Sequence, residues 1–491
     1  MQVGLDGITI NICNSFDDTP QYQAYFVDNF FHFKPISTMK QIKPLPALSE
    51  NPFLRYFAFI ALYFSQGIPE GITCFAIPAW MAMNGKSASE IATYGALIVL
   101  PFSLKILLAP MMERFTFLPM GRRRPWLLFG QFGIFCSLIG LSFVPDPLNN
   151  LTLLITAVMC VHVFIIFQDI ATDSLAIDIV PLDQQGKANS FMWGSKTVGI
   201  SIALAAGTWL INHYGFSNAV LLLSTATFFI ILLPLLLRER QGEKLLPWSS
   251  GATSPEAALL KMDSWGKLLL SFKQVVLLRN TLLICLIVFM SKCALTYIET
   301  LLPVFSIQEL GWNNLDYANT YSTSRLMGGI IGMVMGALLI ARFGTVRMFQ
   351  ICLLLAGLLT ASMGAFKLFW QNTIYVSAFI AIFNLMYTLI TISQLATAMQ
   401  VCWKRISALQ FTFFMTLANV GMAAGSALFG YLRSHFGWQI IFLVFTLMVI
   451  GVAVLLQFLK MNTHLKQVKN LETNYLGNEA KLLNQMVLNI E

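Results

Sequence analysis

Charge is scarce in this sequence of 491 residues, in which Asp, Glu, Lys and Arg make up 11% and apolar residues 57%. Charged residues form about 25% of a typical soluble domain, so the composition excludes an ordinary soluble protein. The eight cysteines are scattered, with no C-x-x-C pair and no metal-binding spacing. Metalloprotease, nucleophile-elbow and dinucleotide-binding patterns are also missing. We therefore expect no metal, no cofactor and no enzymatic activity.

Long apolar runs dominate the sequence instead. Twelve of them are long enough for a membrane-spanning helix, which needs about 17–25 residues. The alternating strands of about ten residues that build a membrane barrel do not occur. Because only helices and closed barrels satisfy the backbone in lipid, the runs predict an all-α membrane protein. The predicted spans are 54–82, 91–112, 126–144, 152–178, 189–211, 217–237, 281–304, 317–341, 347–366, 373–399, 407–432 and 438–459.

Positive charge is concentrated on alternate loops between these spans. Of the 31 Lys and Arg residues, 24 lie on one set of segments, which includes both terminal regions. Three lie on the other set, at Lys86, Lys367 and Arg433, and four fall within spans. The positive-inside rule then predicts that both termini are cytoplasmic. The net charge of +8 suits a surface that faces anionic lipid headgroups, and we expect no nucleic-acid partner.

The spans form two groups of six that resemble each other. Asn212–Phe216 precedes the sixth span, and the similar Ser434–Trp438 precedes the twelfth, at an offset of 222 residues. Parallel repeats of six helices build one large group of secondary transporters. We therefore predict two six-helix halves, at 51–237 and 281–460.

Three segments lie outside the two halves. The first is polar and rich in proline, and is predicted to be largely disordered. The second contains an amphipathic stretch around Trp265–Val276, which predicts a helix on the cytoplasmic interface. The third is predicted to be a cytoplasmic tail. These segments are the N-terminal extension 1–50, the linker 238–280 and the tail 461–491.

The loop between the second and third spans carries an unusual charge cluster. An acidic residue and Arg end the second span, and Gly121 then precedes three consecutive Arg residues. These groups can form ion pairs and cap helix ends at a cytoplasmic gate; the alternative is an ordinary cluster of positive charge on an inner loop. The predicted gate residues are Glu113, Arg114, Arg122, Arg123 and Arg124. The loop resembles the signature of the major facilitator superfamily, with Glu in place of the common Asp and with an inserted stretch.

The inserted form of the loop resembles one branch of that superfamily, which holds the anhydromuropeptide permeases and the acetyl-coenzyme A transporters. The resemblance rests on Leu104–Arg114 with Gly121–Arg124, on Gly67–Gly71, and on Gln168–Asp178 followed by Gly186–Asn189. It covers about residues 60–200 and implies a twelve-helix transporter that works by alternating access.

Ionisable groups within the spans are expensive in lipid and are therefore functional candidates. In the fourth span His162, Asp169 and Asp173 share a narrow stripe at helical spacing. Two carboxylates one turn apart repel each other, which favours a protonated form. We predict that Asp169 or Asp173 carries a coupling proton; the alternative is a structural acid held by an ion pair.

Several further polar residues are assigned to a substrate cavity. Lys105 and Lys292 lie too deep to reach water easily, so each needs an acidic partner or an anionic ligand. A polar stripe on the tenth span suits the hydroxyls or amides of a sugar or peptide. The predicted cavity residues are Lys105, Lys292, Gln168, Glu70, Asn384, Tyr387 and Gln394. Glu299 and Arg325, in the outer halves of spans seven and eight, are predicted to form an outer gate or, alternatively, a permanent brace.

Together these features predict a proton-coupled transporter of a polar anionic solute such as a muropeptide. Its partners are a small-molecule substrate, protons and membrane lipids, and the protein is expected to be monomeric in a bacterial inner membrane. Two alternatives remain open. The same fold can carry an acyl-coenzyme A-like compound or a drug, or the protein can be a membrane receptor that transports nothing.

Overall fold

The computed structural model describes residues 47–86, 88–262, 264–312 and 314–488. Within these ranges the secondary structure is helical, apart from one isolated bridge between Ala47 and Arg238. Most of the predicted N-terminal extension, residues 1–46, lies outside the described residues. Eleven of the described helices are long and apolar enough to cross a membrane.

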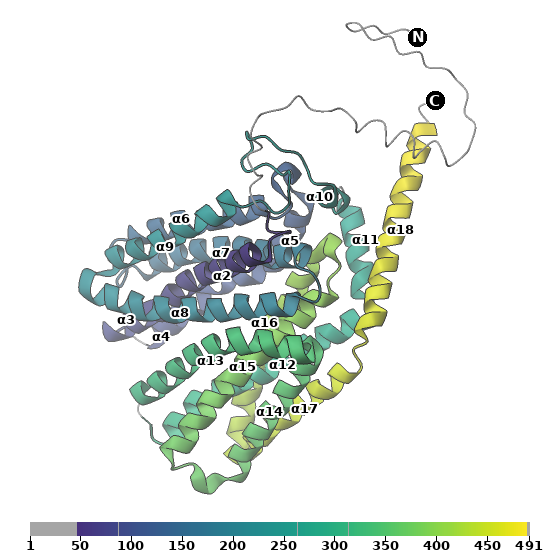
Figure 1. Cartoon of the computed structure of the whole chain (residues 1–491). Helices are drawn as coiled ribbons and strands as arrows, with labels where there is room; N and C mark the ends of the chain where they lie inside the picture. Colours follow the sequence, from purple (N-terminus) through teal and green to yellow (C-terminus); the bar gives the residue numbers. More distant parts are fainter. Residues whose placement is uncertain (1–46, 87, 263, 313, 489–491) are drawn as a thin grey trace, which may run out of the picture. The chain divides into compact units, whose positions relative to one another are not determined.

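The first half contains the helices α2 to α9 (Figure 1). The predicted first span is helical throughout, as α2, the π-helix η1 and α3, although its polar residues lower its hydropathy. The predicted second span is interrupted by the 3₁₀ turn η2. The elements are α2 (Pro52–Glu70), η1 (Gly71–Ala76), α3 (Ile77–Met83), α4 (Ala88–Ile98), η2 (Leu100–Leu104), α5 (Lys105–Arg114), η3 (Leu118–Met120), α6 (Arg124–Ser142), α7 (Leu151–Ile179), α8 (Gln185–Tyr214) and α9 (Phe216–Leu236).

The second half follows a linker that contains two short helices. The predicted amphipathic stretch of the linker forms α11, and the predicted tail forms one long helix, α18. The elements are α10 (Pro255–Leu259), α11 (Trp265–Val276), α12 (Arg279–Val304), η4 (Phe305–Glu309), α13 (Asn314–Phe343), α14 (Thr345–Ala365), η5 (Lys367–Phe369), α15 (Thr373–Val401), η6 (Lys404–Ile406), α16 (Ser407–His435), α17 (Trp438–Gln457) and α18 (Met461–Leu488).

Glycines set the closest helix contacts, and they do so at equivalent places in the two halves. A Cβ added at Gly199 on α8 would clash with the backbone of Phe64 on α2. At the repeat offset of 222 residues, a Cβ added at Gly421 on α16 would clash with the backbone of Phe289 on α12. Helix backbones approach this closely only where side chains are small. The pairs α2 with α8 and α12 with α16 therefore repeat one packing arrangement.

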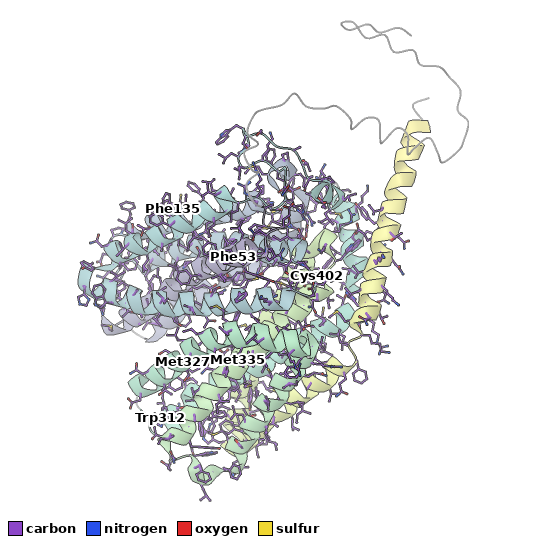
Figure 2. The ribbon with its side chains drawn as sticks, viewed as in Figure 1. Phe53, Phe135, Trp312, Met327, Met335 and Cys402 are labelled. Carbon is purple, nitrogen blue, oxygen red and sulfur yellow. The ribbon has the colours of Figure 1, made fainter. Side chains whose placement is uncertain are left out.

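The halves meet along α8 and α13, and again where α5 and α7 pack against α16. We call the end of the bundle that carries residues 115–123, 180–184 and 402–406 the basic end. Figure 1 shows α11 and α18 running across this end rather than along the bundle. Figure 2 labels Cys402 near these two helices and Trp312 at the far end of the second half. Buried Leu268 and Val275 of α11 belong to an apolar cluster with Trp403 and Leu409.

Candidate functional site

A buried charge cluster joins the two halves at the basic end. Arg123 donates to Glu113 Oε2 at 2.8 Å and to Asp178 Oδ2 at 3.0 Å. Arg122 pairs with the same two acids, at 3.1 Å from Asp178. All four side chains are at most 1% exposed. Two guanidinium groups and two carboxylates therefore neutralise each other away from water, where charge-assisted hydrogen bonds are strong.

The cluster reaches the second half through the start of α16. Arg122 Nη1 donates to the Lys404 carbonyl at 2.7 Å, and Arg123 Nη2 donates to Ser407 Oγ at 3.0 Å. The backbone N–H of Ala408 donates to Glu113 Oε1 at 2.6 Å, in the first turn of α16. We call Glu113, Arg122, Arg123, Asp178 and Ser407, with these backbone partners, the bridge. The bridge therefore joins the two halves at the basic end.

A carboxylate that the sequence did not single out orders the arginines. Glu239 accepts hydrogen bonds from the backbone N–H groups of Arg122 at 3.0 Å and Arg123 at 2.7 Å, and also from that of Arg124. These N–H groups precede or begin α6. A carboxylate at the N-terminus of a helix is also stabilised by the helix dipole. Desolvation by burial, followed by the charge of Arg123, lowers the pKa of Arg122.

Two of the predicted gate residues lie outside the bridge. The Arg114 guanidinium lies 5.8 Å from the centre of the Phe115 ring and forms none of the ion pairs found among the described residues. Arg124 donates to the carbonyls of Pro234 at 2.5 Å and Lys244 at 2.7 Å, at the end of α9 and in the linker. Asp178 and Ser407 take part instead. The position of Asp178 near the cytoplasmic end of its span favours a role in the gate or at lipid headgroups, whereas sequence reasoning did not single out Ser407.

Eight acidic and basic side chains lie in the middle of the described spans, away from the basic end; we call them the interior charges. They are Glu70, Lys105, Asp169, Asp173, Lys196, Lys292, Glu299 and Arg325. Three ion pairs join six of them. Lys105 pairs with Asp169, Lys196 with Glu70 at 2.6 Å, and Arg325 with Glu299 at 2.7 Å. The first two pairs lie in the first half and the third in the second half. Because Glu299 and Arg325 both belong to the second half, on α12 and α13, their ion pair does not itself connect the halves.

Asp173 and Lys292 are the two interior charges that remain without an ion pair among the described residues. Asp173 accepts a hydrogen bond from the Tyr63 hydroxyl on α2. Lys292 lies 5.7 Å from the ring centre of Trp193 on α8 and 5.4 Å from that of Tyr387 on α15. Both residues are less than a tenth exposed. A lone acid therefore lies in one half and a lone cation in the other.

The aromatic rings near Lys292 also connect it to the ion pairs on either side. The ammonium of Lys196 lies 5.8 Å from the Trp193 ring, and the guanidinium of Arg325 lies 5.0 Å from the Tyr387 ring. Each ring therefore contacts two cations, which its electron-rich face favours. Sequence reasoning did not single out Trp193, because an aromatic residue on an apolar helix is usually a packing residue.

The other predicted cavity residues bind neighbouring helices or their own helix. Gln168 donates to the Leu62 carbonyl at 3.0 Å, and Asn384 donates to the Ile380 carbonyl at 3.0 Å. Gln394 accepts from Ser291 at 3.0 Å, while its Nε2 is buried without a partner. His162 donates from Nδ1 to the Ile98 carbonyl. The structure does not bring Gln168 together with Lys292.

The interior cations differ in how much of the side chain is exposed, and Lys292 is only 8% exposed. The exposed fraction of the side chain rises from 9% for Lys105 to 15% for Lys196 and 34% for Arg325. An open groove of about 640 Å³ lies at the end opposite the bridge between α13 and α15, lined by Thr320, Ser324, Thr373 and neighbouring residues. Two repeated halves of spanning helices, joined at one end by an ion-pair cluster and with charged groups in the middle of the spans, are the architecture of a membrane transporter.

Sequence comparison identifies the family. The chain belongs to the Major Facilitator Superfamily, whose sequence pattern matches residues 59–426. The prediction of this superfamily and of its two-half, twelve-helix fold is confirmed. The chain is therefore an integral membrane protein and a transporter of this superfamily.

Curated relatives fall in the predicted branch. The anhydromuropeptide permease of Escherichia coli (strain K12) is 23% identical over 386 residues, which cover 78% of this chain and 75% of the relative. A putative transporter AmpG 1 of Rickettsia bellii is 21% identical over 81% of this chain and 95% of the relative.

Solved structures of the superfamily share the fold at low sequence identity. FucP in its outward conformation matches with a TM-score of 0.60 and 14% identity, over 84% of this chain and 99% of that one. The human organic anion transporter MFSD10 matches with a TM-score of 0.59 and 13% identity, over 83% of this chain and all of that one. These matches concern the fold alone.

Proposed function

We propose that this protein is a proton-coupled secondary transporter that moves a polar anionic solute by alternating access. The observation that carries the proposal is the pair of lone charges, Asp173 in the first half and Lys292 in the second. A buried charge without an opposite charge is costly, so each group needs a compensating ligand. A proton compensates Asp173, and an anionic group of the substrate compensates Lys292.

The bridge is proposed to be the cytoplasmic gate. The positive-inside rule assigns the basic end to the cytoplasm, together with both termini. A closed bridge at this end then describes an outward-facing state. Opening toward the cytoplasm requires that Arg122 and Arg123 release the Lys404 carbonyl and Ser407. Glu299 and Arg325 act as a brace within the second half and shape the outer mouth.

The proposed substrate is a muropeptide-like solute. The relative from Escherichia coli is named for anhydromuropeptides, and such compounds combine sugar rings with carboxylates. Trp193 and Tyr387 beside Lys292 offer ring faces next to a positive charge, which suits a sugar acid. The unpartnered Nε2 of Gln394 supplies a further donor on α15. A monomer in a bacterial inner membrane is the proposed setting.

Uptake by the purified protein in liposomes tests this function. A radiolabelled anhydromuropeptide should accumulate when the outside is made more acidic than the inside, and accumulation should stop when a protonophore dissipates the gradient. An acyl-coenzyme A of similar size tests the alternative cargo in parallel, and protein-free liposomes provide the background. Equal uptake with and without the gradient would exclude proton coupling, and binding without any uptake would favour a receptor.

A further inference from the structure

The interior charges follow a simple pairing rule. Four are acidic and four are basic, and three acids are paired with three of the bases. The two that remain, Asp173 and Lys292, have opposite sign and lie on α7 and α12. With every group ionised, the eight interior charges therefore sum to zero. His162 is counted as neutral in this sum; its Nδ1 donates to the Ile98 carbonyl, and its Nε2 lies 2.8 Å from the Thr73 hydroxyl.

A net charge in this region opposes the conformational change. Ions are poorly stabilised in a low-dielectric interior without compensation. A charge that moves through the membrane field also contributes about 2.3 kcal/mol per 100 mV. A carrier whose interior charges sum to zero avoids both effects when it changes between outward-facing and inward-facing states.

We propose that transport is electroneutral, with one proton on Asp173 crossing together with one negative charge at Lys292. This inference rests on the proposed function and adds its stoichiometry. The empty carrier has a sum of zero. Protonation of Asp173 changes the sum to +1, and one anionic group at Lys292 restores zero. A carrier that holds only the proton or only the anion is charged, so it changes state slowly, and this asymmetry enforces coupling.

The surroundings of each lone group support this assignment. Asp169 stays ionised, since Lys105 and Gln66 both bind it, Gln66 at 2.5 Å. The proton is therefore assigned to Asp173, whose bound neighbour is the neutral Tyr63 hydroxyl. The ionisable groups around Asp173 are Tyr63 on α2, Asp169 on α7, Lys105 on α5, Lys196 on α8 and Cys402 after α15.

The surroundings of Lys292 leave its charge open to a ligand. The charged groups around it are Glu299 on α12, Arg325 on α13 and Lys196 on α8. Glu299 is already paired with Arg325, and Lys196 with Glu70. The Lys292 ammonium also lies over the faces of two rings, which attract a cation but do not neutralise it.

The test separates a pH gradient from a membrane potential in liposomes. The probe is the disaccharide of N-acetylglucosamine and anhydro-N-acetylmuramic acid, which has a single lactyl carboxylate. A pH gradient alone should drive accumulation, with one proton entering per probe molecule. A potassium diffusion potential alone, set with valinomycin, should change neither the rate nor the final accumulation. Uptake that responds to the potential would overturn electroneutrality and leave proton coupling intact, whereas no uptake under any gradient would overturn the proposed function itself.

The variant Asp173→Asn should exchange the response to a pH gradient for a response to the membrane potential. Asp173→Asn removes the proton site, so the carrier moves the anion alone. The final accumulation of the probe should then no longer respond to the pH gradient, but should change about 50-fold per 100 mV, as one uncompensated charge requires. Asp146→Asn, at an exposed position outside the spans, is the control and should behave as the unchanged protein does. Accumulation by Asp173→Asn that still follows the pH gradient would assign the proton to another residue.

Discussion

The bridge and the interior charges differ in whether every charged group has an ion-pair partner within the protein. At the bridge, both carboxylates and both guanidinium groups are paired and at most 1% exposed. Backbone groups form further hydrogen bonds with the Arg122 guanidinium and the Glu113 carboxylate. Among the interior charges, each half retains one group without an ion pair. Completed pairs stabilise one conformation, whereas lone charges require something from outside the protein.

The comparison also explains why the clusters lie at different places. The bridge connects α5 and α7 with α16, so in the proposed mechanism it is present in only one of the two conformations. The three interior ion pairs each lie within one half, so they can persist when the halves move. We therefore expect substitutions in the bridge to change the conformational equilibrium, and substitutions at the lone charges to change binding and coupling.

The largest effect is expected at Glu113, which binds both arginines and the first turn of α16. Glu113→Gln leaves buried guanidinium charge that Asp178 alone cannot balance, and loss of one partner of a buried ion pair costs about 3–5 kcal/mol. The closed state should lose this stabilisation relative to the open state. In a protein whose only cysteine is Cys402, a maleimide should react with Cys402 roughly tenfold faster or more when Glu113→Gln is present than when it is absent.

Asp183→Asn, at an exposed position of the same end, is the control and should leave the reaction rate of Cys402 unchanged. An unchanged rate in Glu113→Gln would exclude a gate role for Glu113.

A smaller loss, confined to binding, is expected at Lys292. Lys292→Met removes the lone cation but keeps most of the side-chain volume, so folding should be preserved. A hydrogen bond to a charged group contributes about 1.5–3 kcal/mol, so the affinity for the anionic disaccharide should fall by about 10–100-fold. Titration calorimetry measures the affinity, and Lys292→Arg should retain part of it. Lys367→Met, at an exposed site in the far loop, is the matched control. Equal affinity in Lys292→Met and the native protein would remove Lys292 from the substrate site.

Much of this architecture can be predicted from the sequence, because only helices and closed barrels satisfy the backbone of an apolar chain in lipid. The length of the apolar runs predicts the helices, and the loop signature predicts where charge gathers. Gly67, Pro69 and Gly71 do not end the first spanning helix, since α2 continues through Pro69 and the chain becomes π-helical at Gly71. The two glycines also admit the backbone of α8, where an added Cβ would lie 2.5 Å from the Lys196 carbonyl or 2.6 Å from that of Ile200.

The pairing of charges could not be predicted, because partners distant in sequence meet only after folding. The sequence indicated that Lys105 needs an acid, but Asp169 lies 64 residues away and Asp173 is an equal candidate on the same stripe. Ser407 gave no signal at all, since one hydroxyl at a helix start is common. Glu239 became informative only when its carboxylate was found beside three backbone N–H groups that begin α6.

A weaker effect on the bridge is expected from α18. Glu472 on α18 accepts from the Trp403 indole at 2.6 Å and from Arg405 Nε at 3.1 Å, and the carbonyl of Arg405 in turn accepts from Arg122. The Glu472 side chain is 29% exposed, so Glu472→Gln should destabilise the closed bridge by only about 1 kcal/mol. Cys402 should then react several-fold faster with maleimide, less than in Glu113→Gln. Thr473→Ala, exposed on the same helix, is the control; identical rates in both variants would show that α18 does not act on the bridge.

The smallest expected effect is a pH dependence in the linker that anchors the bridge. Burial, and then the charge of Glu239, raises the pKa of Glu243 from an ordinary 4.5 to about 7. The folded protein therefore binds this proton more tightly than the unfolded chain does, so the stabilisation is complete below about pH 4.5 and is lost as pH rises through about 7.

Glu243→Gln mimics the protonated group and should abolish that loss. The melting temperature of the native protein should fall by about 1–2 °C between about pH 5.5 and 7.5 because of this group, and the variant should not show the same fall. Ser254 donates to Glu243 at 2.8 Å, and an amide oxygen can keep this hydrogen bond. Glu256→Gln, nearby on α10 and exposed, should retain the native pH dependence. If Glu243→Gln retains it as well, Glu243 is not the group that causes this pH dependence.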